Sequence, residues 1–282
     1  MSDGFINLNK NSGMTSHDAV NRVRKIFSTR KVGHAGTLDP AASGVLPIAI
    51  GRATKFIEYL ADCQKIYRAE ILFGIATDSG DLEGKIISRA DNNFKMPTAD
   101  DFKAVLKNFI GEIEQTPPKF SAIKIHGRKA YDLARKNLDF DMPRRLVTIS
   151  DIKLLALEKN SATIEISCGK GTYIRSLAID IGERLKIPAM LKNLLRLRVG
   201  DFDLKNSVIL DQLTAENILP IETCLNHLPR FELNENRIRA FLNGLPTTIH
   251  APNQNSLRIF AGNKFLGVGR IERGELRSSK II

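Results

Sequence analysis

The sequence contains few cysteines and no pattern that would pair them. Its three cysteines, Cys63, Cys168 and Cys224, are odd in number, lie far apart and form no Cys-x-x-Cys motif. The five histidines show no ligand spacing either. These absences argue against a structural zinc site and favour buried free thiols.

Long apolar runs are also missing. No stretch approaches the roughly 20 apolar residues that cross a bilayer as a helix. The first residues, MSDGFINLNKNSG, lack the charged start and apolar centre of a signal peptide. We therefore expect a cytoplasmic protein without a membrane partner.

Acidic residues are outnumbered by basic ones. The chain of 282 residues has 42 Lys and Arg against 31 Asp and Glu, a net charge of +11. Basic residues cluster in segments 22–31, 119–145 and 230–282, and the first of these has five cations and no acid. The excess favours a polyanion: RNA, DNA or an anionic membrane surface. A single cluster usually marks a solvated face, but three of them favour a nucleic-acid partner.

One segment, GHAGTLDPAASGVLPIAIG at residues 33–51, places a carboxylate between a glycine loop and an apolar run. Pro40 favours extended geometry at Asp39, and residues 44–50 are typical of a buried strand. Loops held by a rigid scaffold often carry active-site groups. Asp before Pro is also common in ordinary turns, so local chemistry leaves both interpretations open.

The remaining pattern mixes helices and strands without regular alternation, which predicts an α+β fold. Apolar spacing predicts a helix after Ser16, which we expect to be its N-cap, and another helix over residues 174–185. Thr98 and Asp101 form a capping-box pattern before a third helix. Alternation predicts strands over residues 67–73 and 163–168.

The last segment of the chain reads as a small β-rich domain. We expect a boundary near Pro229, giving domains 1–229 and 230–282, with a hairpin that turns at a Gly-Asn pair. About 50 residues make a marginal independent core. We therefore expect this piece to pack on the rest of the chain.

The motifs together resemble the TruB family of pseudouridine synthases. Residues 33–56 resemble its catalytic segment, and KIYRAEILFGIATDSGDLEG and SCGKGTYIRSLAIDIG resemble its next two motifs. Residues 117–135 resemble its RNA-gripping insertion, which we place at about 117–145, and the C-terminal segment resembles its PUA-type RNA-binding domain. The matches follow the family's order from about residue 4 to residue 199. The resemblance implies a catalytic domain built on a mixed, mainly antiparallel sheet flanked by helices.

The resemblance also implies roles for individual residues. Asp39 falls on the catalytic nucleophile, Tyr67 on the active-site tyrosine and Arg175 on the arginine that pairs with the carboxylate. Without the resemblance, Tyr67 would read as a packing aromatic and Arg175 as a surface cation. Further implied substrate contacts come from the flipped-base loop, the uridine pocket and the insertion: His34, Tyr173, Leu194, Lys124 and Arg128.

Isomerising uridine to pseudouridine adds no atoms, so the resemblance implies no cofactor and no metal. The chain has no Gly-x-x-x-x-Gly-Lys phosphate loop. A partly buried Asp39 keeps its charge only with a cation nearby. The resemblance implies that Arg175 is this cation. Attack on C6 of the base and a route through a ribose glycal both remain open.

The implied substrate is the T loop of tRNA at position 55, with the protein acting as a monomer by default. An RNA-binding or tRNA-folding chaperone without catalysis is the alternative, and a ribosomal RNA target in a guide-directed particle is a third hypothesis. One departure from the family is Asn11, where proline usually follows the lysine at Lys10. We expect this departure to be tolerated.

Overall fold

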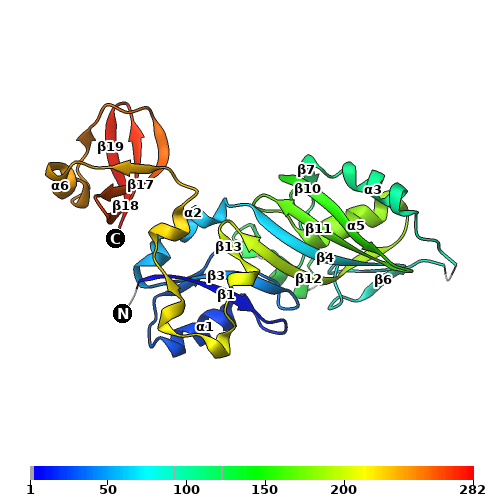
Figure 1. Ribbon diagram of the computed structural model, residues 1–282. Helices are drawn as coiled ribbons and strands as arrows, with labels where there is room; N and C mark the ends of the chain where they lie inside the picture. The colour runs from blue at the N-terminus through cyan, green and yellow to red at the C-terminus, as the bar shows by residue number, and fades with distance from the viewer. Residues whose placement is uncertain (1–2, 92, 122, 137) are drawn as a thin grey trace. The chain divides into compact units, whose positions relative to one another are not determined.

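The computed structural model describes residues 3–91, 93–121, 123–136 and 138–282 (Figure 1). The chain folds into two compact units. The first comprises Met1–Pro40, Gly44–Asp62 and Val199–Ile282, and the second comprises Ala41–Ser43 and Cys63–Arg198. Within the described residues, none of the helices is long and apolar enough to cross a membrane.

The N-terminal part of the first unit consists of antiparallel strands and one helix. Strand β1 (Gly4–Lys10) pairs with β3 (Ser43–Ile50) on one side and with β14 (Ile218–Leu219) on the other. Strand β2 (Val32–His34) pairs with the end of β3. The buried strand expected over residues 44–50 is thus confirmed, and it leaves the loop with Asp39 between β2 and β3.

Helix α1 (Ser16–Ile26) precedes β2 and buries Ala19, Val20 and Val23. Its N-cap is Thr15, whose side chain accepts from the Asp18 N–H while the Asp18 carboxylate accepts from the Thr15 N–H. The prediction that Ser16 caps this helix is therefore wrong. Ser16 is buried instead, and its hydroxyl bonds to the backbone of Leu38.

The C-terminal part of the first unit is a five-stranded sheet in the order β15-β17-β18-β19-β16. Its strands are β15 (Arg230–Glu232), β16 (Thr247–Thr248), β17 (Gln254–Ala261), β18 (Lys264–Glu272) and β19 (Glu275–Ile281), with helix α6 (Ile238–Leu242) before β16. The expected Gly-Asn turn joins β17 to β18. The core includes Leu233, Phe241, Ile259 and Leu276.

This sheet packs against the short helical segment formed by η1 (Gly51–Phe56) and α2 (Ile57–Ala61). The rings of Phe56 and Phe265 lie 6.0 Å apart, and Lys280 pairs with Glu58 at 3.0 Å. The expectation that the C-terminal piece packs on the rest of the chain is confirmed. The domain boundary at residue 230 stays a prediction.

The second unit contains a row of sheet strands in the order β12-β4-β11-β10-β7. Strands β4 (Lys65–Phe73), β11 (Ser161–Cys168), β10 (Arg145–Leu157) and β7 (Gly111–Gln115) are antiparallel, and β12 is Ala189–Val199. Helices α3 (Ala99–Lys107) and α5 (Ile174–Leu185) lie against it and against each other (Figure 1). Thr98 caps α3 as expected. The α+β prediction is confirmed.

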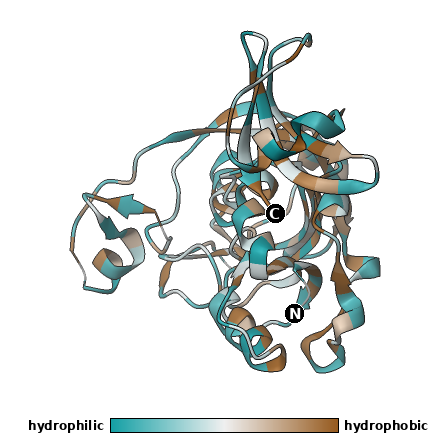
Figure 2. Cartoon of the chain, turned by 90° about the vertical axis from the view of Figure 1, so that its left-hand side faces the viewer, coloured by the Kyte–Doolittle hydropathy of each residue, from teal (hydrophilic) through white to brown (hydrophobic). Residues whose placement is uncertain are grey.

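Smaller elements complete the second unit. A ribbon of β5 (Ile75–Thr77) and β6 (Ile86–Arg89) follows β4, and the hairpin of β8 (Lys124–Ile125) and β9 (Arg128–Lys129) leads into α4 (Ala130–Arg135). In Figure 2, polar and apolar residues alternate along the same helices and strands, as elements that bury one face require. The first unit's remaining short elements are β13 (Phe202–Asp203), η2 (Leu204–Asn206), η3 (Leu210–Gln212), η4 (Ala215–Asn217), η5 (Glu222–Leu225) and η6 (Glu235–Arg237).

Candidate active site

The loop with Asp39 is anchored on both sides of that residue. On one side, the buried Ser16 hydroxyl donates to the Leu38 carbonyl at 3.0 Å and accepts from the Leu38 N–H at 2.9 Å. On the other side, the Pro40 carbonyl accepts from the Gly13 N–H at 2.9 Å. Asp39 itself is half-buried. Its carboxylate is therefore carried by a fixed backbone at the edge of the first unit's core.

Lys10 strengthens the second anchor. Its side chain is fully buried, and its ammonium donates to the carbonyls of Asn11, Met14 and Pro40 at 3.0, 2.8 and 3.3 Å. These bonds tie the turn over residues 11–14 to the residue after Asp39. The turn thus forms although Asn11 stands where the family usually has proline.

His34 ends β2 and opens the same loop, where it pairs in register with Ile48. It is half-buried, less exposed than its position between two glycines predicts. Gly36, two residues on, has φ of 90°, a conformation that favours glycine. This glycine lets the chain turn between His34 and Asp39.

Arg175 is buried in the second unit, in the first turn of α5. Its residue is 5% exposed, which rules out the interpretation as a surface cation. Its guanidinium donates to the carbonyls of Ser79 and Phe120 at 3.1 and 2.9 Å. A buried guanidinium also needs a counter-charge.

Asp81 supplies such a charge. Its carboxylate lies 3.4 Å from Nη1 of Arg175, with the two side chains 15% and 6% exposed. The Ser79 hydroxyl donates to the other Asp81 oxygen at 2.5 Å. The Gly80 carbonyl accepts from the Leu191 N–H at 2.9 Å, which ties this turn to β12. Arg175 is thus held on a rigid frame of two turns and a helix.

The other residues of the implied uridine pocket come from three elements of the second unit. Tyr67 is 9% exposed on β4, opposite Ile166. Leu194 is half-buried on β12, the neighbouring strand. Tyr173 is half-buried and is the N-cap residue of α5, two positions before Arg175.

Tyr173 has no capping hydrogen bond from its own side chain. Its backbone is instead held by Gln115, the last residue of β7. The Gln115 amide nitrogen donates to the Tyr173 carbonyl at 3.1 Å, and the Tyr173 N–H donates to the Gln115 amide oxygen at 2.9 Å. Gln115 is 1% exposed, so water does not compete for these bonds.

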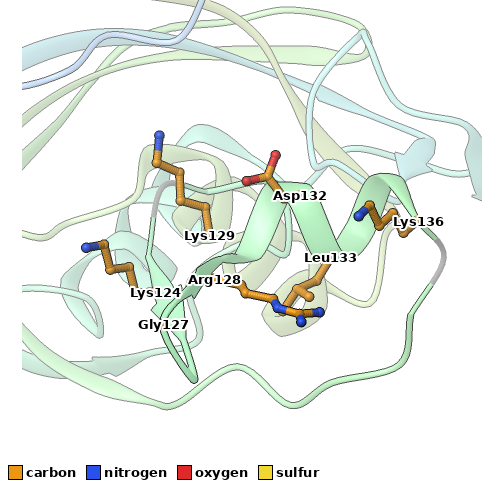
Figure 3. A pocket seen from close by; sticks show the side chains of 7 residues that line it. All are labelled: Lys124, Gly127, Arg128, Lys129, Asp132, Leu133 and Lys136. Carbon is orange, nitrogen blue, oxygen red and sulfur yellow. The ribbon is translucent and has the colours of Figure 1, made fainter.

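The insertion carries a cationic cavity of about 530 Å³. Figure 3 shows its side chains on the β8–β9 hairpin and on α4. Four cations and one carboxylate line it together with Gly127 and Leu133: Lys124, Arg128, Lys129, Lys136 and Asp132. All five charged residues are exposed, so an anion can reach the cavity from the solvent. Lys124 and Arg128, both expected to contact RNA, share this cavity.

The cysteines are the buried free thiols that their spacing predicts. Burial raises the pKa of Cys168 to about 11 and that of Cys224 to about 12. Neither thiol is a nucleophile near neutral pH, because the thiolate is the reactive form.

Comparison with known proteins identifies the family. The model described as the N-terminal domain of TruB family pseudouridylate synthase matches residues 24–174, and the TruB pseudouridine synthase II C-terminal model matches residues 229–282. A tRNA pseudouridine synthase B of Clostridium kluyveri is 40% identical over 95% of either chain. One of Bacillus subtilis (strain 168) is 41% identical over 91% of this chain and 86% of the relative. The chain belongs to the TruB family.

Solved structures agree with that assignment. The protein chain matched in a Cbf5-Nop10-Gar1 complex is 26% identical to this TruB family member, with a TM-score of 0.77 over 99% of this chain and 84% of that one. A chain of an H/ACA RNP bound to a substrate RNA, 24% identical over 99% of this chain and 84% of that one with a TM-score of 0.75, shares the fold. The resemblance and the fold class predicted from the sequence are confirmed.

Two residues of this TruB site escaped the sequence reasoning. Asp81 lies in the segment resembling the second motif, but a carboxylate in an Asp-Ser-Gly-Asp turn gives no sign of its partner. Gln115 precedes Thr116 and two prolines and looks like an ordinary strand end. Only the folded sheet brings Gln115 to residue 173, which is 58 positions away.

Proposed function

We propose that the protein isomerises uridine to pseudouridine in tRNA, at position 55 of the T loop. The observation that carries the proposal is the carboxylate of Asp39, set between two anchored neighbours within the family-matched region. A nucleophile on a fixed loop loses little freedom in the transition state, which is the usual advantage of preorganised sites.

The reaction conserves atoms. The bond from C1′ of the ribose to N1 breaks, a bond from C1′ to C5 forms, C5 loses its proton and N1 ends with one. Asp39 provides the nucleophile for either the C6 route or the glycal route. Arg175 is the cation that pairs with the Asp39 carboxylate, Tyr67 stacks on the uracil, and Tyr173 and Leu194 complete the base pocket.

Access to the base requires flipping it out of the RNA stack, at a cost of a few kcal/mol. His34, on the loop that carries Asp39, fills the vacated place with a planar ring and offsets part of that cost. The cationic cavity of the insertion holds phosphates through Lys124 and Arg128. Such contacts position the RNA without reading its sequence.

The test is incubation with unmodified tRNA and mapping of pseudouridine at nucleotide resolution. Wild-type protein should convert position 55, whereas Asp39→Asn should form none and still bind tRNA within about tenfold, since phosphates supply most of the affinity. Asp100→Asn is the matched control, because Asp100 is exposed on α3 and pairs only with the nearby Lys103 among its described salt bridges. Binding without conversion by the wild type would favour a tRNA-folding chaperone.

We also propose that the protein works as a monomer in the cytoplasm, on the T arm alone. Light scattering in solution reports its mass, and cell fractionation reports its location. A T-arm hairpin should be converted with kcat similar to that of whole tRNA. If conversion required the rest of the tRNA, the proposal that the T arm alone is sufficient would be wrong.

A further inference from the structure

The first turn of α5 is held by residues 115–120, the short stretch of chain that ends β7 and begins the insertion. The Ser176 hydroxyl donates to the Thr116 carbonyl at 2.7 Å, and Arg175 donates to the Phe120 carbonyl at 2.9 Å. The side chain of Gln115 adds its two bonds to the backbone of Tyr173. Gln115, Phe120 and Thr116 thus fix the N-cap Tyr173 and two residues of the first turn of α5.

Gln115 has the most specific part in this arrangement. A helix normally satisfies its first N–H groups with a capping side chain of its own. In α5 the N-cap Tyr173 contributes no such bond. Its carbonyl accepts both from the Leu177 N–H, at 3.0 Å within the helix, and from Gln115. An amide from a distant strand therefore sets where α5 begins.

The position of that start determines the position of Arg175. The arginine is two residues beyond Tyr173 on the same rigid turn, so a shift of the N-cap moves the guanidinium by a similar distance. Misplacement of a reacting group by about 1 Å can lower a rate about a hundredfold. The backbone of Gln115 is itself fixed, because β7 pairs with β10 through Arg145 opposite Gln115.

We propose that Gln115 is a positioning residue of the isomerisation, one that places Tyr173 and Arg175 through the backbone of the α5 N-cap. This inference rests on the proposed function of the site. Gln115 touches the Tyr173 backbone and acts through Tyr173 and Arg175 on the substrate, so its removal should slow chemistry and leave tRNA binding nearly unchanged.

The test variant is Gln115→Met, which keeps the length of the side chain and removes both hydrogen bonds. At saturating tRNA we expect kcat to fall at least tenfold, with the Kd for tRNA changed less than threefold. Gln64→Met is the matched control: Gln64 is exposed, in the same unit, and donates to Ser150 at the surface. That control should leave both constants within twofold of the wild type.

Hydrogen exchange supplies a readout that general loss of stability would not produce. In Gln115→Met the amides of Tyr173 and its immediate neighbours should exchange faster, while the amides of β4 and β11 keep their protection. Ser176→Ala, which removes only the bond to Thr116, should lower kcat at least threefold and leave Kd unchanged. If Gln115→Met does not fold, this variant still tests whether the hold on the first turn of α5 sets kcat.

Unchanged kcat in the folded variants, or a loss of binding equal to the loss of kcat, would overturn the proposal. An inactive wild type would overturn the proposed function instead. The exchange measurement needs no activity, so it still shows whether Gln115 fixes the start of α5.

Discussion

At the scale of single residues, the site depends on charges that are buried together with their partners. Arg175 and Asp81 lie 3.4 Å apart with little exposure, and Ser79 holds the second carboxylate oxygen. Removing one member of a buried pair leaves the other charge uncompensated, which costs about 3–5 kcal/mol where burial is complete. Exposed pairs contribute about 0–1 kcal/mol.

We therefore expect Asp81→Asn to lower the free energy of unfolding by about 2–4 kcal/mol and kcat by at least tenfold. Urea unfolding and single-turnover assays at saturating tRNA measure the two effects. The matched control is Asp100→Asn, whose partner Lys103 is exposed, and its loss should stay below about 1 kcal/mol. An equal loss of unfolding free energy in the two variants would show that burial does not strengthen the contribution of the Asp81–Arg175 pair.

The same residues show where prediction from sequence stops. Asp39 and Arg175 stand in motifs, so their types and spacing are visible along the chain. Asp81 and Gln115 act through partners 94 and 58 positions away, and a sequence pattern carries no information on such pairs until the strands are placed. Ser16 was interpreted as a cap because Ser and Thr share that preference; Thr15 has the extended backbone that a cap needs.

At the scale of elements, helix α5 begins at an N-cap held by hydrogen bonds and carries, further along, a carboxyl group whose burial is unfavourable. Asp180 is partly buried on α5, and burial, with the charge of Glu183 second, raises its pKa to about 6. The unfolded chain has an ordinary pKa near 3.8. Between these values the native state binds more protons than the unfolded state, so stability falls as the pH rises from about 4 through 6 and stays lower above that.

Asp180→Asn should therefore stabilise the protein at pH 7.5, by roughly 1–3 kcal/mol before solvent screening reduces it. At pH 4 the substitution should have little effect. Urea unfolding at the two pH values measures the difference. Glu165→Gln, on the less buried side of β11, is a control for general charge effects. A gain at pH 4 equal to that at pH 7.5 would contradict the role of burial.

The burial of Asp180 has no signature in the sequence. The positions of strands and helices, in contrast, follow from the periodicity of apolar residues. The strand over residues 44–50 lies where an apolar run predicted it, and the strands over residues 67–73 and 163–168 and the helix over residues 174–185 lie where alternation and helical spacing predicted them. Each of these patterns lies within one element, so it can be recognised along the chain. The two-residue strands β8 and β9 have no such pattern, because only the hairpin that joins them makes them strands.

At the scale of the whole molecule, the net charge of +11 connects fold and function. Its clusters lie on α1, on the insertion and on the C-terminal sheet, each on a stable scaffold with its own buried residues. The C-terminal sheet could be recognised from its hairpin, but its packing on η1 could not, since Phe56 and Phe265 are far apart in sequence. Basic surfaces on folded elements favour contact with several phosphates at once.

Salt dependence tests whether the insertion contributes to that contact. The double variant Lys124→Gln and Arg128→Gln removes two cations from the cavity of the insertion. If each binds one phosphate, the slope of log Kd against log salt concentration should fall by about 1.4–1.8, since each contact contributes about 0.7–0.9. Filter binding of tRNA between low and moderate salt measures the slope.

The matched control replaces Lys107 and Lys159, two exposed lysines outside the cavity, and changes the net charge by the same amount. If long-range attraction by the whole protein set the slope, both double variants would lower it equally. Phosphate contacts at the cavity predict a larger change for Lys124 and Arg128. In the proposed function these side chains hold the RNA and Asp39 acts on the base, so kcat at saturating tRNA should be preserved. A loss of kcat at saturating tRNA, with an unchanged slope, would show that Lys124 and Arg128 act in the chemical step and not in RNA binding.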